Sequence, residues 1–275
     1  MVVFPNCKIN LGLHITGKRP DGYHELETVF YPVQLRDALE IVHATTEEPE
    51  DIRFTTSGLS IPGNSASNLC VKAYQLLKKD FPELPPIQMH LHKVIPMGAG
   101  LGGGSSDGAF ALKLLNEKFQ LQLNQDQLIH YAAQLGSDCP FFILNRPCYG
   151  TGRGEILEPI ELNLSGHRFV LIHPGIHVST KWAFEQLTPA KAPRPITEIL
   201  QQSLSEWKRE LVNDFEAPIL RAYPEIASIK RALYDDGAVY ASMSGSGSTV
   251  FGIYAPGQAI GIQEKISHPC QVAEG

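Results

Sequence analysis

Hydrophobic and polar positions divide the first part of the chain into segments of recognisable period. Residues 8–16 and 25–34 are rich in β-branched and apolar side chains, which favours strands, and the polar sequence TGKRPDGYHE between them predicts a turn. We expect a third strand over residues 37–43 and a solvated acidic loop at residues 47–51. Alternation of Ile87, Met89 and Leu91 predicts a strand with one buried face.

Helical periodicity appears in three places between these strands and the middle of the chain. The first helix follows Ser67, which we predict to be its N-cap, and its apolar face carries Leu69, Ala73, Leu76 and Leu77. Two more apolar faces are formed by Leu112, Leu115 and Phe119, and then by Leu128, Ala132 and Leu135. Gly136 is placed to end the last of these helices.

The pattern changes after Gly154, and we place a boundary near residues 149–161. RFVLIHPG predicts a buried strand, residues 188–195 a proline-rich loop, residues 196–234 several helices, and AVYA and TVFGIY two further strands. Strands and helices are mixed without regular βαβ alternation, so the fold class is α+β. We predict two domains, residues 1–154 and 155–275.

Composition narrows the class of protein. The chain has 275 residues, of which 43% are hydrophobic and 19% charged, as in ordinary globular proteins. The net charge of -6 argues against nucleic-acid and membrane partners, although a local cluster can still bind an anionic small molecule. The 5 cysteines include no CxxC pair, which favours reduced thiols. With no leader-like N-terminus and no apolar run of ~20 residues, we expect a cytoplasmic protein.

The sequence GAGLGGGSS, residues 98–106, matches several glycine-rich patterns only in part. Gly98-x-Gly100-x-x-Gly103 has the spacing of a dinucleotide-binding loop, but the acidic residue about 20 positions on is Glu117, inside a helical pattern. A Walker loop needs Lys before Ser105, where this chain has Gly104. Protein-kinase HRD and DFG elements are missing from the sequence.

The physical interpretation of this loop is a cradle for phosphate. A glycine loop that runs into a helix presents free backbone N–H groups at the positive end of the helix dipole. Ser105 and Ser106 add hydroxyl groups at its rim. The alternative is a turn whose glycines only allow two elements to pack closely, although such a turn needs fewer glycines.

Two charged residues are candidates for chemistry at this cradle. Asp138 follows a helix end in LGSDCPFF, where it acts either as a helix N-cap or as the carboxylate that accepts a proton from a substrate hydroxyl. Lys8 lies in an apolar strand, where it is either a snorkelling surface residue or the partner of a reacting group. Asn10 shares the strand face of Lys8 because side chains alternate along a strand.

Two polar turns leave further alternatives open. Tyr23 and His24 in RPDGYHE either bind a base or sugar or cover the core. SMSGSGST, residues 242–249, forms either a second anion-binding nest or a flexible hairpin turn.

Taken together, these motifs resemble the GHMP kinase superfamily. PMGAGLGGGSSDGA resembles its phosphate-binding motif, and KINLGLHITGKRPDGYHELETVF, GSDCPFF and MSGSGSTVF match it in order and spacing from about Cys7 to Phe251. The resemblance implies two α+β domains with the active site in the cleft between them. It also implies phosphoryl transfer from ATP, with Mg²⁺, to the 2-hydroxyl of a cytidine diphosphate-linked methylerythritol in non-mevalonate isoprenoid biosynthesis. Gly108 departs from the family, which commonly has Ala there; we expect a small cost in helix propensity.

The resemblance also assigns site residues by position. Asp138 and Lys8 take the catalytic positions, Asn68 and Lys93 flank the adenine, and Tyr23 with Phe184 encloses the cytosine ring. The ATP-phosphate loop comprises Pro96, Met97, Gly98, Ala99, Gly100, Leu101, Gly102, Gly103, Gly104, Ser105 and Ser106, and the substrate positions are Asn10, Tyr23, His24, Thr180 and Phe184. The alternatives are a GHMP kinase for another small alcohol, such as homoserine or mevalonate, and a non-catalytic nucleotide-binding regulator of the same fold.

Overall fold

The computed structural model describes residues 1–44 and 51–274, so most of the acidic loop expected at residues 47–51 lies outside the described residues. The chain forms two compact units that interleave along the sequence. Unit 1 comprises Met1–Cys7, Arg36–Met97 and Gly102–Arg146, and unit 2 comprises Lys8–Leu35, Gly98–Leu101 and Pro147–Gly275. These units are defined by contacts and not by order along the chain. The division into consecutive domains, 1–154 and 155–275, stays a prediction.

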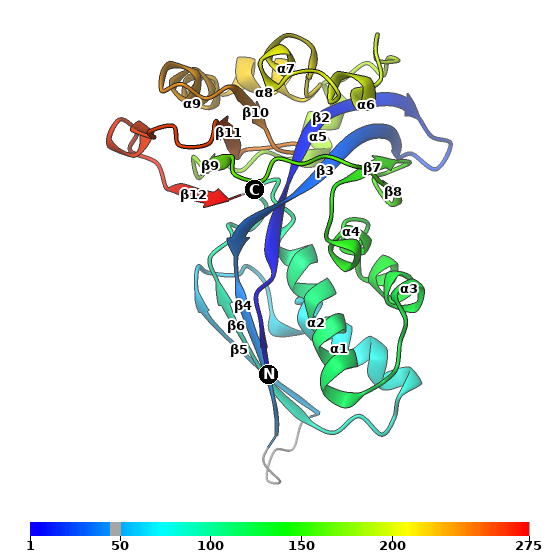
Figure 1. Cartoon of the computed structure of the whole chain (residues 1–275). Helices are drawn as coiled ribbons and strands as arrows, with labels where there is room; N and C mark the ends of the chain where they lie inside the picture. Colours follow the sequence, from blue (N-terminus) through cyan, green and yellow to red (C-terminus); the bar gives the residue numbers. More distant parts are fainter. Residues whose placement is uncertain (45–50, 275) are drawn as a thin grey trace. The chain divides into compact units, whose positions relative to one another are not determined.

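Unit 1 is a sheet with helices on one face. The sheet has the strand order β1-β4-β6-β5, in which only the β5–β6 pair is parallel. Helices α1 and α2 cover one face of this sheet, and α3 and α4 pack against α2 (Figure 1). Its elements are β1 (Val2–Val3), β4 (Ala38–His43), β5 (Ile52–Gly58), η1 (Ser65–Ser67), α1 (Leu69–Asp80), β6 (Ile87–Lys93), α2 (Gly103–Phe119), α3 (Gln125–Leu135) and α4 (Cys139–Leu144).

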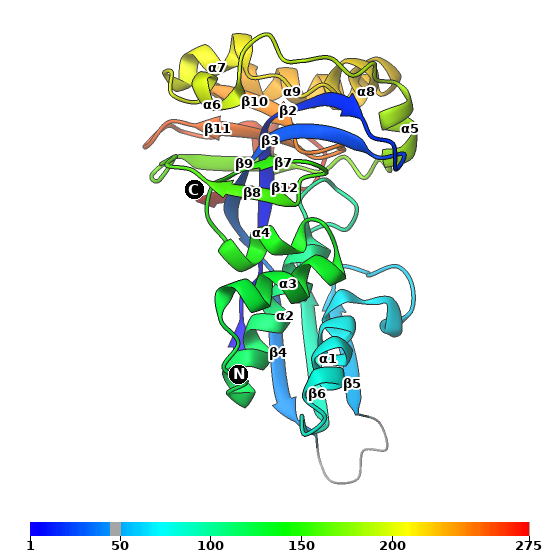
Figure 2. The same cartoon turned by 90° about the vertical axis from the view of Figure 1, so that its right-hand side faces the viewer.

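Unit 2 contains two antiparallel sheets and most of the short helices. One sheet has the order β10-β11-β9-β12, with α9 packed on β10 and β11 (Figure 2), and the other has the order β2-β3-β7-β8. Its elements are β2 (Asn6–Lys18), β3 (His24–Arg36), β7 (Cys148–Thr151), β8 (Ile156–Pro159), β9 (Arg168–Ile172), α5 (Thr180–Glu185), α6 (Ile196–Ile199), α7 (Leu204–Glu210), α8 (Glu216–Ala222), α9 (Pro224–Asp235), β10 (Tyr240–Met243), β11 (Val250–Tyr254), η2 (Ile262–Glu264) and β12 (Cys270–Glu274).

The expected apolar faces are buried where the elements form. Ile87, Met89 and Leu91 of β6 point into the core of unit 1, and α3 ends at Gly136 as predicted. In unit 2, Leu13 and Ile15 of β2 share one buried cluster with Val170 and Ile172 of β9. The α+β fold class is therefore confirmed.

One helix start differs from the prediction. The N-cap of α1 is Asn68, whose Oδ1 accepts the backbone N–H of Cys70 at 2.9 Å. Ser67 instead ends the short helix η1, where its Oγ donates to the carbonyl of Asn64. Both residues are good caps, and the preceding turn of η1 decides between them.

Among the described residues, none of the helices combines the length and the apolar character that crossing a membrane requires.

Candidate active site

The glycine loop leads into α2 through alternating left-handed residues. Gly98, Gly100 and Gly102 have φ angles of 65°, 80° and 69°. Gly102 is the N-cap of α2 and, being a glycine, has no side chain with which to cap this helix end. Because the first N–H groups of a helix have no acceptor within the helix, the start of α2 offers its backbone donors to an anion.

Two glycines of the loop also permit close packing, as the alternative interpretation expected. A Cβ atom at Gly100 would lie 2.1 Å from the carbonyl oxygen of Ser244, and one at Gly103 would lie 2.8 Å from Cγ2 of Ile95. Gly98 differs, because a Cβ atom there would meet nothing within 4 Å. Close packing at Gly100 and Gly103 and open space at Gly98 are therefore both present in one loop.

Beneath the start of α2 lies a buried cluster formed by Lys93, Asp37 and Asp107. The ammonium of Lys93, in a residue only 1% exposed, donates to Oδ2 of Asp37 and, at 2.7 Å, to Oδ2 of Asp107. Asp37 Oδ1 accepts the backbone N–H groups of Val94 at 2.6 Å and Ile95 at 2.9 Å. This cluster therefore joins the end of β6, which precedes the glycine loop, to the helix that follows it.

The charges in this cluster shift its protonation equilibria. Burial raises the pKa of Asp107 to about 8, with Lys93 opposing the shift and Asp37 adding to it. Burial alone would lower the pKa of Lys93, but Asp107 and Asp37 outweigh it and leave that pKa raised. Lys93 was expected to flank the adenine, and the structure places its charged end between two carboxylates.

Asp138 is the N-cap residue of α4, but its side chain makes no capping bond to the helix. The residue has helical φ and ψ angles of -85° and -15°, and its side chain makes no capping hydrogen bond to α4. The next residue, Cys139, is buried, and its thiol contacts Ser105 in the first turn of α2. Asp138 therefore occupies the N-cap position, as one of its two interpretations expected, without a capping side-chain bond, and the half-buried carboxylate lies one residue from a contact with the glycine-loop helix.

In unit 2, Lys8 is buried, so the snorkelling interpretation is wrong. Only 5% of this residue is exposed, and its ammonium donates to Oδ1 of Asn10 at 2.7 Å and lies 5.1 Å from the ring centroid of Phe30. Asn10 Nδ2 in turn donates to Oγ1 of Thr28 at 3.0 Å. The predicted shared face of Lys8 and Asn10 is confirmed.

The aromatic residues expected at the substrate have partners of their own in unit 2. His24 stacks on Phe184 with ring centroids 4.7 Å apart, and the guanidinium of Arg153 lies 4.8 Å from the ring centroid of Tyr23. Tyr23 is 56% exposed. Thr180 Oγ1 lies 3.3 Å from Oγ of Ser246 in the connection between β10 and β11. The enclosure of a cytosine ring between Tyr23 and Phe184 stays a prediction.

SMSGSGST belongs to a hairpin, as one of its two interpretations expected. Its first residues end β10, which pairs with β11, and the backbone N–H of Ser244 donates to the carbonyl of Thr249 at 2.9 Å. Anion binding by this turn stays a prediction.

Sequence reasoning missed the partners of several site residues. The sequence did give a signal for Asp107. It is a carboxylate next to the small residues Gly108 and Ala109 in the first part of a helix, where a charged side chain that packs closely needs a partner. Asp37, Thr28 and Ser244 carried none, because their contacts come from residues distant in the sequence.

Comparison with known proteins identifies the family models and the relatives that this chain matches. Residues 68–146 match the family described as GHMP kinases N terminal domain, and residues 196–271 match GHMP kinases C terminal. The chain is 55% identical over 256 residues to a Bacteroides thetaiotaomicron protein named 4-diphosphocytidyl-2-C-methyl-D-erythritol kinase, with 93% of each chain covered. A Bacteroides fragilis protein of the same name is 52% identical over 260 residues, with 94% of each covered.

A solved structure agrees with these relatives. The crystal structure of a 4-(cytidine 5'-diphospho)-2C-methyl-D-erythritol kinase superposes with a TM-score of 0.86 at 30% identity, covering 100% of both chains.

Proposed function

This chain belongs to the GHMP kinase family, and from that premise we propose that it phosphorylates 4-diphosphocytidyl-2-C-methyl-D-erythritol at the expense of ATP. The observation that carries the proposal is the run of left-handed glycines leading into the start of α2, whose N-cap is itself a glycine. Such a loop surrounds phosphate oxygens with backbone donors. The acceptor is the 2-hydroxyl of the substrate, and the reaction is a step of non-mevalonate isoprenoid precursor biosynthesis in the cytoplasm.

In the proposed reaction, one set of residues binds ATP and another binds the acceptor. The transition state is loose and mainly requires in-line positioning and stabilisation of charge. Residues 96–106 hold the triphosphate of ATP, and Asn68 lies toward its adenine. Lys93, whose ammonium is enclosed by Asp37 and Asp107, supports the loop from the end of β6. Asn10, Tyr23, His24, Thr180 and Phe184 hold the cytidylated alcohol.

Asp138 accepts the proton of the attacking hydroxyl, and Lys8 stabilises charge beside it. One observation supports the assignment of Lys8: it is a buried cation whose ammonium donates to Oδ1 of Asn10 at 2.7 Å. Asp138 and Lys8 belong to different compact units, so their approach to one substrate is part of the proposal.

Mg²⁺ would neutralise charge on the β- and γ-phosphates. In the part of the chain that the structure describes, no group of three or more His, Cys, Asp or Glu residues is arranged to hold a metal ion. Mg²⁺ in kinases commonly relies on one or two protein oxygens together with phosphates and water. Ser106 Oγ, buried in the first turn of α2 with no described hydrogen-bond partner, is an oxygen of the required kind. The residues therefore fit such an ion.

Release of ADP tests the proposal directly. The purified protein should release ADP from ATP when 4-diphosphocytidyl-2-C-methyl-D-erythritol and Mg²⁺ are present, and stop when EDTA removes the metal. Homoserine and mevalonate serve as the matched acceptors of the alternative kinases. Turnover with either of these in place of the cytidylated alcohol would reassign the substrate, and ATP binding without any turnover would favour the non-catalytic regulator.

The Asp138→Asn substitution tests the catalytic assignment. We expect kcat to fall by about 10²–10⁴-fold, because the amide no longer accepts the hydroxyl proton. KM for both substrates should change little. Asp126→Asn, which changes an exposed carboxylate at the start of α3, is the control and should keep normal turnover. Near-normal kcat in Asp138→Asn would remove Asp138 from the mechanism.

A further inference from the structure

The middle of the glycine loop rests on the hairpin loop, residues 244–249, which connects β10 to β11. Oγ of Ser244 donates to the carbonyl of Gly100 at 2.8 Å, and the backbone N–H of Thr249 donates to the carbonyl of Ala99 at 3.3 Å. Gly100 approaches so closely that a Cβ atom there would lie 2.1 Å from the carbonyl oxygen of Ser244. The conformation of residues 99–100 therefore depends on where the hairpin loop lies.

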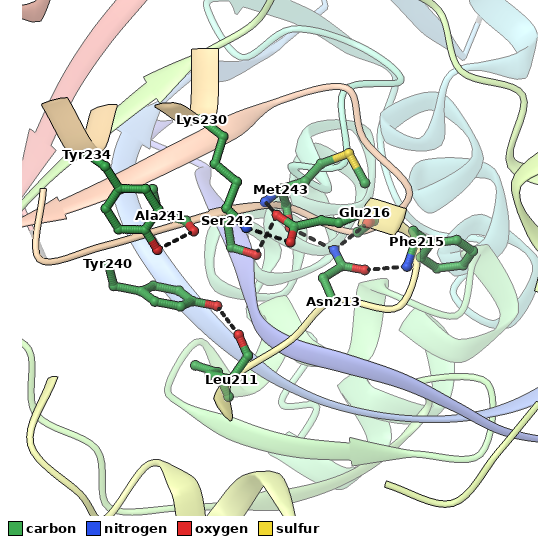
Figure 3. A network of polar contacts seen from close by, with 11 residues as sticks. Leu211, Asn213, Phe215, Glu216, Lys230, Tyr234, Tyr240, Ala241, Ser242 and Met243 are labelled. Atoms are coloured by element: carbon green, nitrogen blue, oxygen red, sulfur yellow. Dashed lines mark hydrogen bonds and ion pairs between the residues drawn. The ribbon is translucent and has the colours of Figure 1, made fainter. Parts of the chain in front are cut away.

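Asn213 holds the hairpin loop at its entry. Its Nδ2 donates to the carbonyl of Met243 at 2.7 Å (Figure 3). It also donates to the carbonyl of Gly245 at 2.9 Å. Its Oδ1 accepts the backbone N–H of Phe215 at 3.0 Å. Asn213 is fully buried. Its amide hydrogens are both donated to the two residues that flank Ser244 in the sequence.

Glu216 fixes the same stretch from its other side. Its Oε1 accepts the backbone N–H of Met243 at 2.8 Å and the hydroxyl of Ser242 at 3.1 Å, and its Oε2 accepts the ammonium of Lys230 at 2.6 Å (Figure 3). The N–H and the carbonyl of Met243 are thus both bound by side chains from residues 213–216. Hydrogen bonds to a charged group are stronger than neutral ones, which makes this anchor stiff.

The segment that carries Asn213 is itself joined to β2. The backbone N–H of Leu13 donates to the carbonyl of Val212, and that of Asp214 donates to the carbonyl of Leu13, each at 2.9 Å. Further along the same strand, the backbone N–H of Asn10 donates to Oγ of Ser244 at 3.3 Å. Asn213 therefore connects the strand of Lys8 and Asn10 to the hairpin loop.

We propose that Asn213 is a positioning residue for the ATP-phosphate loop. By holding the carbonyls of Met243 and Gly245, it keeps Ser244 against Gly100. Residues 98–101 thereby keep the backbone conformation that receives the triphosphate. This proposal rests on the proposed function, because it takes the glycine loop to be the ATP site.

The Asn213→Asp substitution separates the donor from the size of the side chain. Aspartate can still accept from Phe215 N–H, but it places an oxygen against the two carbonyls that the amide had bound, and oxygen facing oxygen repels. We expect KM for ATP to rise about tenfold or more, since small displacements in a site have large effects. The dissociation constant of a non-hydrolysable ATP analogue, measured by calorimetry, should rise by a similar factor. KM for the cytidylated alcohol should change much less.

Tyr234→Phe is the matched control. It removes the hydrogen bond from the Tyr234 hydroxyl to the carbonyl of Ala241, at 3.1 Å, in the same network but outside the hairpin loop. Both variants should lose some thermal stability, but only Asn213→Asp should weaken ATP binding. Equal weakening in both would show a general structural effect and overturn the proposal, as would unchanged ATP affinity in Asn213→Asp.

Ser244→Ala provides a second variant if Asn213→Asp does not fold. It removes the hydroxyl that donates to Gly100 and should raise KM for ATP in the same direction; no change would overturn the proposal. Calorimetric binding of the ATP analogue separates the proposed role of Asn213 from the proposed kinase function. A wild-type protein that binds the ATP analogue but does not phosphorylate the cytidylated alcohol contradicts the proposed function alone. A wild-type protein that does not bind the analogue contradicts both.

Discussion

Lys93 and Lys8 are both buried lysines on strands, and their surroundings differ. Lys93 donates to two carboxylates that join β6 to α2, and Lys8 donates to the amide oxygen of Asn10 beside the ring of Phe30. In the sequence each is one basic residue in an apolar strand pattern. Their burial became visible only with the fold, because a buried ammonium needs partners that come from distant segments.

The Asp107→Asn substitution should change how stability depends on pH. Burial raises the pKa of Asp107 from 3.8 to about 8, so across that window the folded protein retains a proton that the unfolded chain releases. The stabilising contribution is therefore present at low pH and lost as pH rises toward 8. Asparagine resembles the protonated acid and stays neutral. We therefore expect the wild type to lose unfolding free energy from pH 5 to pH 8 relative to Asp107→Asn, so that the difference between the two shifts in favour of the variant.

Urea denaturation at several pH values measures this difference. Glu83→Gln, at an exposed carboxylate in the same unit, is the control and should follow the wild-type pH dependence. Parallel curves for Asp107→Asn and the wild type would contradict the assignment.

At the scale of elements, long periodic segments were predictable and short or polar strands were not. The apolar faces of β6, α2 and α3 formed where periodicity placed them. β5 was missed because its sequence, IRFTTSG, is mostly polar and exposed, and β7 and β8 were missed because each has four residues. A short strand is defined by its neighbour's hydrogen bonds, which leave no local pattern.

The effect of Gly108 depends on the helix that packs against α2. We expected only a small propensity cost for this glycine in α2. In the structure, a Cβ atom at Gly108 would lie 2.8 Å from Cβ of Leu69 at the start of α1. The glycine therefore permits close packing of the two helices, an effect that helix propensity does not contain.

Alanine substitutions in the glycine loop should separate backbone strain from collision. Gly98→Ala introduces a side chain at a φ of 65° with open space around it, so we expect a loss of about 1–2 kcal/mol in unfolding free energy. Gly100→Ala adds a collision with the Ser244 carbonyl to a φ of 80° and should lose clearly more. Urea denaturation of both variants checks the order. Equal losses would mean that the hairpin loop moves aside without cost.

At the scale of the whole molecule, the chain passes repeatedly between the compact units. The chain crosses from one unit to the other after Cys7, Leu35, Met97, Leu101 and Arg146. Strands β2 and β3 therefore each contribute residues to both units. A sequence is divided most simply into consecutive parts, as the predicted domains 1–154 and 155–275 are. Contacts between distant segments follow no such order.

Unfolding of the two units should therefore be coupled. The chain has 2 tryptophans, Trp182 and Trp207, and both belong to unit 2, so tryptophan fluorescence reports on that unit. Far-UV circular dichroism reports on the helices and strands of both. Since each unit depends on strands that continue into the other, we expect the two urea transitions to coincide. Separate midpoints would show that the units unfold independently.

The sequence by itself determined the family, the α+β class and the place of the glycine loop, because these depend on motifs and periodicities that are local in the chain. A glycine needed for a left-handed φ, or an apolar residue on every turn of a helix, leaves its mark at its own position. The tertiary structure alone decided that Lys93 is enclosed by Asp37 and Asp107, and that Asn213 holds the hairpin loop beneath Gly100. These are hydrogen bonds between residues far apart in the chain. Their energy depends on burial and direction, which only the folded chain defines.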